Sequence, residues 1–295
     1  MHKKAISVVL TTYNGAQFIQ KQITSILNQT VLPQEIIICD DRSTDNTVDI
    51  LKSFATNSLI KLFINEKQLG VVENFKKGVR NAIPGNWIAF ADQDDIWRDN
   101  KLEKSGNAMQ ELDDDFTPAL IFSDLNIINQ NDDITNNSFW NQQKIDPSKI
   151  TLKSLLYGNI VTGCTMLVNS PMLTEFLNMP KTEFLHDEWL ALIAYSFGKF
   201  KFIPEQLIQY RQHNNNVTFS NSVKPLNFSQ RLKFELDHIS GKKKFLPRQF
   251  KLAETFLKNY RNQLNENSIS IFEDFVKLEN KHYFFQRLSR KIANS

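Results

Sequence analysis

Three carboxylates, Asp92, Asp94 and Asp95, lie within four residues, directly after the apolar stretch 86–91. This stretch follows a Pro-Gly turn signal and is predicted to form a buried strand. Charges this close repel one another and are costly to remove from water, so a cation between them is expected. Oxygen ligands suit Mg²⁺ or Mn²⁺, which proteins hold through one or two carboxylates and substrate phosphates. Taken alone, the run is more typical of a solvated turn or a helix cap than of a metal site.

Two other predicted strands also end in polar residues. The first, at residues 5–11, is almost continuously apolar or β-branched and leads into a Thr-Thr-Tyr segment. The second, at residues 35–39, leads into a pair of aspartates. Continuous apolar runs of this kind are typical of central parallel strands. The polar residues at these two strand ends are Thr11, Thr12, Tyr13, Asp40 and Asp41.

The elements that position these clusters alternate between strand and helix. Apolar residues at helical spacing predict helices after each of the first three strands, the third of them at 71–82. A β-α-β-α-β-α-β order predicts an α/β fold with a doubly wound, Rossmann-like, mostly parallel sheet flanked by helices. Such sheets bind ligands beyond the carboxyl ends of their strands. We therefore expect the three polar clusters to meet in one nucleotide site.

The chain contains neither a G-x-x-x-x-G-K-[ST] loop nor a G-x-G-x-x-G motif, and it has only 9 glycines. A site without a glycine cradle but with clustered carboxylates needs a metal to neutralise bound phosphate. The residues therefore predict a nucleotide-diphosphate ligand with Mn²⁺ or Mg²⁺ as cofactor.

The composition, 41% hydrophobic and 23% charged over 295 residues, is that of a globular protein. Cys39 and Cys164 lie in apolar runs and are expected to be core residues in a reducing compartment. The basic N-terminus is not followed by a signal-type apolar region, and no apolar run is long enough to span a membrane. A cytoplasmic protein is expected.

Charge is distributed unevenly along the chain. Residues 221–295 contain 15 Lys+Arg and 7 Asp+Glu, which leaves 20 and 25 for residues 1–220. Together with the helical spacing of apolar residues near the C-terminus, this predicts a main domain at 1–220 and a basic helical extension at 221–295. The extension is expected to rest on the anionic inner face of the cell membrane, or to pack against the body or another subunit. No nucleic-acid-binding motif is present, so no nucleic-acid partner is expected.

Several segments resemble family 2 glycosyltransferases of the GT-A fold. They include S-V-V-L-T-T-Y-N at 7–14, I-C-D-D-R-S-T-D at 38–45 and D-Q-D-D-I-W at 92–97. The resemblance continues in order through 163–165, 186–189 and Y-R-Q-H-N at 210–214. It looks closest to bacterial, rhamnosyltransferase-like enzymes of surface-polysaccharide assembly. The resemblance implies inverting, metal-dependent transfer of a sugar from a UDP- or dTDP-sugar to a growing cell-surface glycan, which is free or lipid-linked.

The resemblance also implies roles for individual residues. Asp92 and Asp94 would form the D-x-D pair, with Asp94 the preferred metal ligand; Asp95 would orient this shell or cap the helix that begins near Asp99. Arg211 would pair with the diphosphate and His213 would complete the metal shell, unless both lie on a surface loop. The residues expected to hold the nucleotide-sugar are Thr11, Thr12, Tyr13, Asp40, Asp41, Asp92 and Arg211.

Asp187 is the candidate catalytic base, because inverting transfer needs a carboxylate to take a proton from the acceptor hydroxyl. Its alternative role is to cap the helix that follows. Glu188 is the second candidate for the base, and His186 is expected to be structural. Asp124 is expected to face the acceptor. Two other functions are considered: a nucleotide-sugar nucleotidyltransferase, and a non-catalytic nucleotide-sugar binding module.

Overall fold

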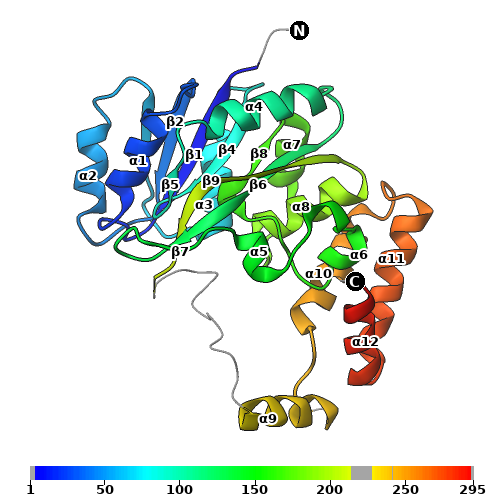
Figure 1. The fold of residues 1–295 in the computed structure, drawn as a ribbon. Coiled ribbons are helices and arrows are strands. Elements are labelled where there is room, and N and C mark those ends of the chain that lie inside the picture. Colours follow the sequence, from blue (N-terminus) through cyan, green and yellow to red (C-terminus); the bar gives the residue numbers. More distant parts are fainter. Residues whose placement is uncertain (1–3, 214–227, 241, 294–295) are drawn as a thin grey trace. The chain divides into compact units, whose positions relative to one another are not determined.

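The computed structural model describes residues 4–213, 228–240 and 242–293, which form two compact units (Figure 1). Unit 1 comprises the described residues of Met1–Pro147, Val161–Ala194 and Gly198–Gln212. Unit 2 comprises those of Ser148–Ile160, Tyr195–Phe197 and His213–Ser295. The predicted domain boundary at 220/221 and Asn214 of the last motif lie outside the described residues.

Unit 1 is built on a nine-stranded sheet with the order β3-β2-β1-β4-β8-β6-β9-β5, in which β7 pairs with β6. β1, β2, β3 and β4 are parallel, and β6 and β9 run in the same direction because β8 is antiparallel to both β4 and β6. The predicted α/β fold with a mostly parallel sheet is confirmed. The strands are β1 (Ile6–Thr12), β2 (Glu35–Asp40), β3 (Ile60–Ile64), β4 (Trp87–Asp92), β5 (Ile96–Trp97), β6 (Ala119–Ile128), β7 (Ile134–Asn136), β8 (Leu167–Val168) and β9 (Lys199–Arg211).

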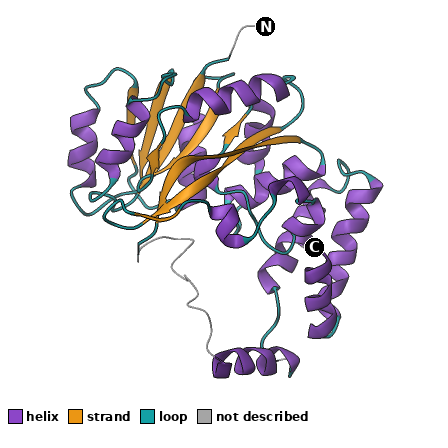
Figure 2. Cartoon of the chain, viewed as in Figure 1, coloured by secondary structure: helices purple, strands orange, loops and turns teal. Residues whose placement is uncertain are grey.

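Helices flank this sheet (Figure 2). Three of them follow β1, β2 and β3 in turn, so the predicted alternation of strand and helix is confirmed. β1 and β2 are buried along their whole length, as expected for central strands covered by helices on both faces. The helices are α1 (Ile19–Leu27), α2 (Thr47–Phe54), α3 (Val71–Arg80), α4 (Lys101–Leu112), α5 (Phe139–Gln143), α7 (Ser170–Asn178) and α8 (His186–Ser196), whose last two residues belong to unit 2.

Unit 2 is helical, and the predicted C-terminal helical extension is confirmed. Its core contains a stacked pair of rings, Phe256 and Phe272, with centroids 5.0 Å apart. Residues 269–292 include parts of two helices, which a 3₁₀ turn at Leu278–Asn280 separates. The helices are α6 (Leu152–Leu155), α9 (Phe228–Ile239), α10 (Pro247–Tyr260), α11 (Glu266–Lys277) and α12 (Tyr283–Ala293). Over the described ranges, no helix combines the length and the apolar character that crossing a membrane requires.

Candidate active site

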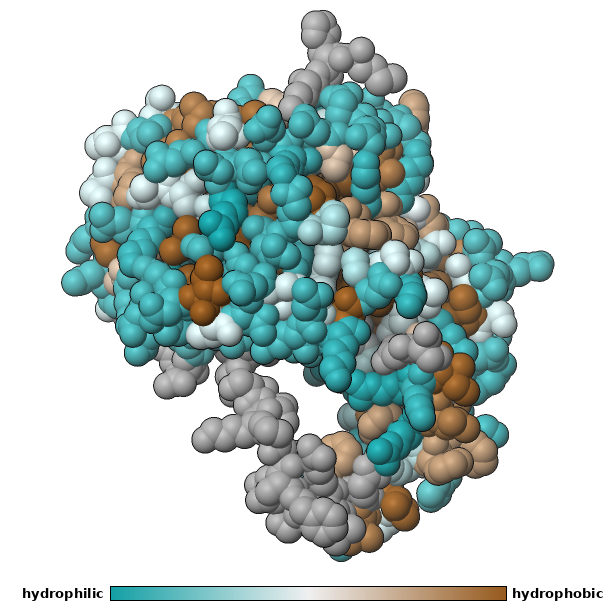
Figure 3. Space-filling view, in the orientation of Figure 1, coloured by the Kyte–Doolittle hydropathy of each residue, from teal (hydrophilic) through white to brown (hydrophobic). Residues whose placement is uncertain are grey.

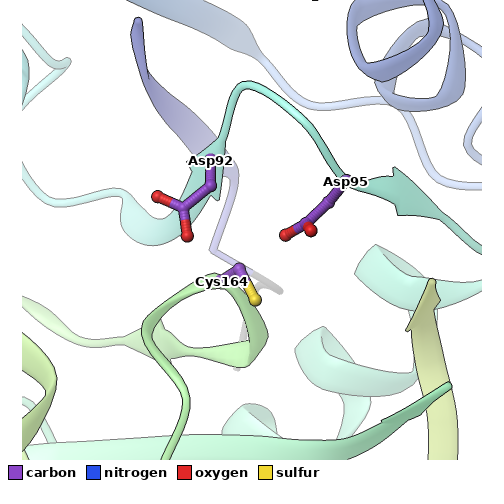
Figure 4. Close-up of side chains that lie close together, drawn as sticks. All are labelled: Asp92, Asp95 and Cys164. Carbon is purple, nitrogen blue, oxygen red and sulfur yellow. The ribbon is translucent and has the colours of Figure 1, made fainter. Parts of the chain in front are cut away.

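The acidic turn, residues Asp92–Asp95, connects the end of β4 to the short strand β5 (Figure 4). Asp94 and Asp95 are buried, and Asp92 is half-buried. Ligand atoms of Asp92, Asp95 and Cys164 lie within 4.8 Å of one another, and Cys164 approaches from a separate 3₁₀ turn, Gly163–Thr165. Asp95 does not cap the next helix, since Asn100 occupies the N-cap position of α4.

The carboxylates of the acidic turn perturb one another. Burial raises the pKa of Asp92 to about 7, with further contributions from the charges of Asp94 and Asp187. Burial, then Asp94 and Asp92, raise the pKa of Asp95 well above its usual range. The same causes, burial first and the charge of Asp95 second, raise the pKa of the Cys164 thiol. Buried like charges held this close indicate a functional site.

The donor set fits a hard divalent cation. Asp95 Oδ2 is buried, and no N–H or O–H group of the described residues donates a hydrogen bond to it. Carboxylate oxygens are the ligands that Mg²⁺ and Mn²⁺ prefer. The structure brings Asp92 together with Asp95 and Cys164, whereas the sequence predicted Asp92 with Asp94 and His213. Asp94 lies in the same turn and His213 is half-buried just after β9, and their metal ligation stays a prediction.

Asp187 lies in the first turn of α8, against the turn that carries Cys164: a Cβ at Gly163 would lie 3.6 Å from Asp187 Cβ. Its charge contributes, after burial and Asp94, to the raised pKa of Asp92. Its carboxylate Oδ1 accepts a hydrogen bond from the backbone N–H of Glu188 at 2.8 Å. The Glu188 carboxylate instead accepts from the backbone N–H of Leu185 at 3.1 Å, at the start of the helix. Both carboxylates thus accept backbone N–H groups at the start of α8, and the choice of Asp187 over Glu188 as the base stays a prediction.

The start of α8 packs tightly against the turn that carries Cys164. A Cβ at Gly163 would lie 2.8 Å from His186 Nε2, so only glycine leaves room for this ring. His186 is enclosed by Phe75, Phe90 and Phe176, and burial lowers its pKa to about 4. Its neutral ring packs as a core group, consistent with the structural role expected for it.

The strand register brings the three predicted polar clusters to one edge of the sheet. Thr11 of β1 is paired with Asp92 of β4, and Thr12 is paired with Asp40 of β2. Thr12 Oγ1 also donates a hydrogen bond of 2.7 Å to Asp40 Oδ2. The side chain of Tyr13, just beyond the end of β1, is 45% exposed and faces solvent at this edge. The predicted convergence of these strand ends is confirmed.

Asp41 organises a neighbouring loop. Its Oδ1 accepts hydrogen bonds from Asn65 Nδ2 at 2.8 Å and from the backbone N–H of Leu69 at 2.7 Å. Its Oδ2 accepts from the backbone N–H of Gly70 at 2.9 Å. These bonds fix the loop that leads into α3, and a direct contact of Asp41 with the nucleotide stays a prediction.

Arg211 connects the end of β9 to the acidic turn. Its side chain is fully buried, and Nε donates a hydrogen bond of 2.8 Å to the backbone carbonyl of Asp94. Its backbone N–H donates to Asp95 Oδ1 at 3.2 Å, and its guanidinium forms an ion pair with Asp132. The predicted pairing with diphosphate stays a prediction; the observed contacts hold the acidic turn in place.

Gln93, which the sequence reasoning did not single out, joins the acidic turn to the end of β1. Its Oε1 accepts a hydrogen bond from the backbone N–H of Tyr13 at 2.8 Å, and its Nε2 donates to the Tyr13 carbonyl at 3.1 Å. A Cβ on Gly15 would overlap the Gln93 carboxamide. Gly15 has no left-handed φ, so it is required here for space rather than for conformation.

The structure corrects the expectation for Asp124. This carboxylate is only 2% exposed, and it accepts hydrogen bonds from Ser138 Oγ at 2.6 Å and Gln206 Nε2 at 2.7 Å. It also accepts from the backbone N–H of Trp140 at 3.1 Å. A fully bonded, enclosed carboxylate has no surface left for an acceptor, so Asp124 anchors the segment around α5.

The fold is of the GT-A type. Residues 1–349 of Staphylococcus aureus TarS, solved in complex with UDP-GlcNAc, match 97% of this chain and 90% of that one, with a TM-score of 0.60 and 16% identity. The model of glycosyl transferase family 2 matches residues 7–169. The chain belongs to this family and is a glycosyltransferase, so the nucleotidyltransferase and the non-catalytic module are set aside.

Curated relatives agree with this assignment. The Escherichia coli protein WfgD, named a UDP-Glc:alpha-D-GlcNAc-diphosphoundecaprenol beta-1,3-glucosyltransferase, is 32% identical over 64% of this chain and 69% of its own length. The putative teichuronic acid biosynthesis glycosyltransferase TuaG of Bacillus subtilis is 29% identical over 73% of this chain and 82% of its own. The dTDP-rhamnosyl transferase RfbG of Shigella flexneri is 29% identical over 72% of this chain and 74% of its own length.

Proposed function

We propose that this glycosyltransferase is inverting and metal-dependent, and that it moves a sugar from a UDP- or dTDP-sugar to a hydroxyl of a growing bacterial cell-surface glycan. The observation that supports the proposal is the position of Asp187 against the turn that carries Cys164, since a Cβ at Gly163 would lie 3.6 Å from Asp187 Cβ and Cys164 lies with Asp92 and Asp95. The names of WfgD and RfbG, one a UDP-sugar enzyme and one a dTDP-sugar enzyme, support the choice of donors.

Asp187 acts as the general base. It takes the proton from the acceptor hydroxyl while that oxygen attacks the anomeric carbon from the face opposite the diphosphate. The bond between the anomeric carbon and the diphosphate oxygen breaks as the new bond forms, so the configuration inverts. A base positioned in this way contributes about 10²–10⁴-fold to the rate.

The acidic turn would hold the cofactor, Mn²⁺ or Mg²⁺, through Asp94 and Asp92; the position of Asp95 close to Asp92 supports it as a further oxygen donor. His213 is retained as a further candidate ligand from the sequence. When bound, the cation supplies charge neutralisation for the diphosphate leaving group. Arg211 keeps the turn in shape through its hydrogen bond to the Asp94 carbonyl.

The nucleotide lies at the edge formed by the ends of β1 and β2. Thr11, Thr12 and Tyr13 line one side, and Asp40 and Asp41 line the other. The exposed ring of Tyr13 offers a surface on which the base stacks. Asp40 is buried and accepts hydrogen bonds from Thr12 Oγ1 and from the backbone N–H of Ser43, so it supports this edge from beneath, and its direct contact with the nucleoside stays a prediction.

The acceptor is proposed to be lipid-linked, and the enzyme to work at the inner face of the cell membrane. WfgD is named for a diphosphoundecaprenol-linked acceptor, and this chain is 32% identical to it. The excess of basic residues in 221–295 supports contact with an anionic surface.

A matched pair of variants tests the base. Release of nucleoside diphosphate is measured with Mn²⁺ and a panel of UDP- and dTDP-sugars, alongside donor binding by calorimetry. Asp187→Asn is expected to lower turnover about 10²–10⁴-fold while donor affinity changes by less than about threefold. Glu188→Gln keeps an oxygen that accepts from Leu185 N–H, so it is expected to retain turnover. Full turnover in Asp187→Asn, or its loss only in Glu188→Gln, contradicts the assignment.

A further inference from the structure

Arg42, the residue after the two aspartates at the end of β2, has an unusual backbone conformation. Its φ is 66°, in the left-handed region that favours glycine. A long side chain in this region costs stability, and such residues concentrate at functional sites. Most of the surface of unit 1 in the view of Figure 3 is hydrophilic, so an exposed arginine is ordinary there. The backbone conformation is what distinguishes Arg42.

Hydrogen bonds on both sides of Arg42 hold it in this conformation. Before it, the backbone N–H of Asp41 donates to the Thr12 carbonyl at 2.8 Å, and the Asp41 carboxylate accepts from the loop that leads into α3. After it, Ser43 donates twice to Asp40, from its backbone N–H at 2.9 Å and from Oγ at 2.5 Å. The segment is therefore fixed around Arg42, which retains a strained backbone.

The other left-handed residues have local explanations. Lys144, with a φ of 57°, is the C-cap of α5, where its N–H donates to carbonyls of that helix. Leu246 directly precedes α10. Arg42 neither ends nor begins a helix, since α2 starts at Thr47. The remaining non-glycine residues of this kind, within the described ranges, are of the two types whose short polar side chains tolerate the region: Asn14, Asp115 and Asp132.

The guanidinium of Arg42 is a donor that the described part of the chain does not use. The residue is exposed, and no hydrogen bond or ion pair joins its side chain to another described residue. The carboxylates before it differ, because both oxygens of Asp40 and both oxygens of Asp41 accept hydrogen bonds from the chain. A guanidinium offers five N–H groups in one plane, and it both donates to oxygens and stacks on flat rings.

The order of the strands indicates which part of a nucleotide Arg42 reaches. β1 lies between β2 and β4, so the end of β2 is about 10 Å from the end of β4, where the acidic turn begins. A diphosphate held at the acidic turn directs its nucleoside across β1, past the exposed ring of Tyr13, towards β2. Arg42 is therefore at the base end of the ligand. Uracil and thymine each present two carbonyl oxygens at the ring edge, and these accept hydrogen bonds from a guanidinium.

We infer that Arg42 is a specificity residue of the nucleotide site, and that its guanidinium donates a hydrogen bond to a carbonyl oxygen of the pyrimidine base that stacks on Tyr13. The inference rests on the proposed function, which places the nucleotide at the ends of β1 and β2. It deepens that proposal, because it names the residue that recognises the base. It does not depend on the catalytic base or on the metal ligands.

Two variants of Arg42 test the contact with the base. Arg42→Gly and Arg42→Asn both remove the guanidinium, and both new residue types adopt a left-handed φ more readily than arginine. Both variants are expected to unfold thermally at or above the wild-type midpoint. Calorimetry is expected to show an affinity about tenfold lower for UDP or dTDP, whichever the wild type binds, because hydrogen bonds from a charged donor are lost. Competition with uridine or thymidine, which carry no phosphate, is expected to show the same fold-change.

Lys144→Gly is the matched control, because it relieves a similar φ at another exposed basic residue of unit 1. It is expected to keep the wild-type affinity. Unchanged affinity in both Arg42 variants overturns the inference. A loss in Arg42→Gly alone also overturns it, since that loss comes from a more flexible loop. A loss for the nucleotide but not for the nucleoside assigns Arg42 to the phosphates and overturns it as well.

The wild-type chain separates this inference from the proposed function. Wild-type binding of UDP or dTDP that does not change in the Arg42 variants contradicts the inference and leaves the proposed function standing. A wild-type chain that binds neither nucleotide contradicts the proposed function, and the inference with it.

Discussion

Two runs of aspartate in unit 1 have opposite environments. In the acidic turn, burial and neighbouring carboxylates raise the pKa of Asp92 and Asp95. In the second run, at the end of α4, Asp113 is also largely buried. There, hydrogen bonds from Asn169, Trp87 and Lys4 outweigh burial and lower its pKa. The next residues in that run, Asp114 and Asp115, form ion pairs with Lys199 and Lys4.

The comparison separates a structural acidic cluster from a functional one. The structural cluster is neutralised by the chain itself, so it stabilises the fold and leaves nothing to bind. The acidic turn keeps buried carboxylates close to one another, at a cost in stability that the proposed cation would offset. Local sequence does not distinguish them, since both are Asp-rich runs at the end of an element.

The largest difference between the two clusters is expected in activity. Asp94→Asn is expected to lower Mn²⁺-dependent nucleoside diphosphate release by about 10²-fold or more, because a proposed metal ligand is lost. Asp114→Asn removes an exposed ion pair with Lys199 and is expected to leave this rate unchanged. Comparable losses of activity in Asp94→Asn and Asp114→Asn would show that the two acidic clusters do not differ in function.

Replacing an aspartate by asparagine is expected to change the free energy of unfolding in opposite directions in the two clusters. The folded-state pKa of Asp92 is raised to about 7, so the metal-free protein loses stability as pH rises from about 4 to 7. Asp92→Asn removes that loss. Because Asp92 is half-buried and partly screened by water, the gain at pH 8 is expected to be on the order of 1 kcal/mol. This gain in stability becomes smaller as the pH falls.

The pKa of Asp113 is lowered, so its stabilisation is present above its unfolded pKa and is lost only in stronger acid. Asp113→Asn is therefore expected to be less stable than the wild type by about 1–3 kcal/mol at both pH 5 and pH 8. Urea unfolding in EDTA at these two pH values measures both variants. A loss of stability in Asp92→Asn at pH 8 would mean that the acidic turn is also neutralised by the chain.

A smaller effect is expected where the acidic turn meets the end of β1. Gly15→Ala displaces the Gln93 carboxamide and Gln93→Ala removes it, so both break the hydrogen bonds to the Tyr13 backbone. Two lost hydrogen bonds are expected to raise the donor KM about tenfold while kcat stays within about threefold. Gly158→Ala is the control, since a Cβ at this position would have no neighbouring atom within 4 Å. If kcat falls and KM does not, Gln93 acts on the chemical step instead.

Much of the fold is predictable from the sequence because its first half has simple periodicity. The continuous apolar runs of β1, β2 and β4, and the helical spacing between them, specify a parallel α/β sheet. β5 and β8 were not predictable, since strands of two residues carry no period. The antiparallel direction of β8 depends on packing between β4 and β6, which no local pattern encodes.

The part of the site that lies at the carboxyl ends of the parallel strands was predictable from the sequence. The strand register places Asp40, Thr12 and Asp92 at one edge of the sheet, because parallel strands end at the same edge. The contacts of Arg211 were not predictable, because they depend on Asn129 and Asp132 in a distant loop. The approach of Cys164 to Asp95 depends likewise on packing around Gly163.

The central claim is that the acidic turn binds a divalent cation together with the nucleotide diphosphate. Calorimetric titration of UDP and dTDP into the full chain, with Mn²⁺ and with EDTA, tests it most directly. The account predicts that one of these nucleotides binds at least about tenfold more tightly with Mn²⁺, and that Asp94→Asn abolishes this gain while Asp114→Asn keeps it. Equal affinity with Mn²⁺ and with EDTA in the wild-type protein would contradict the claim.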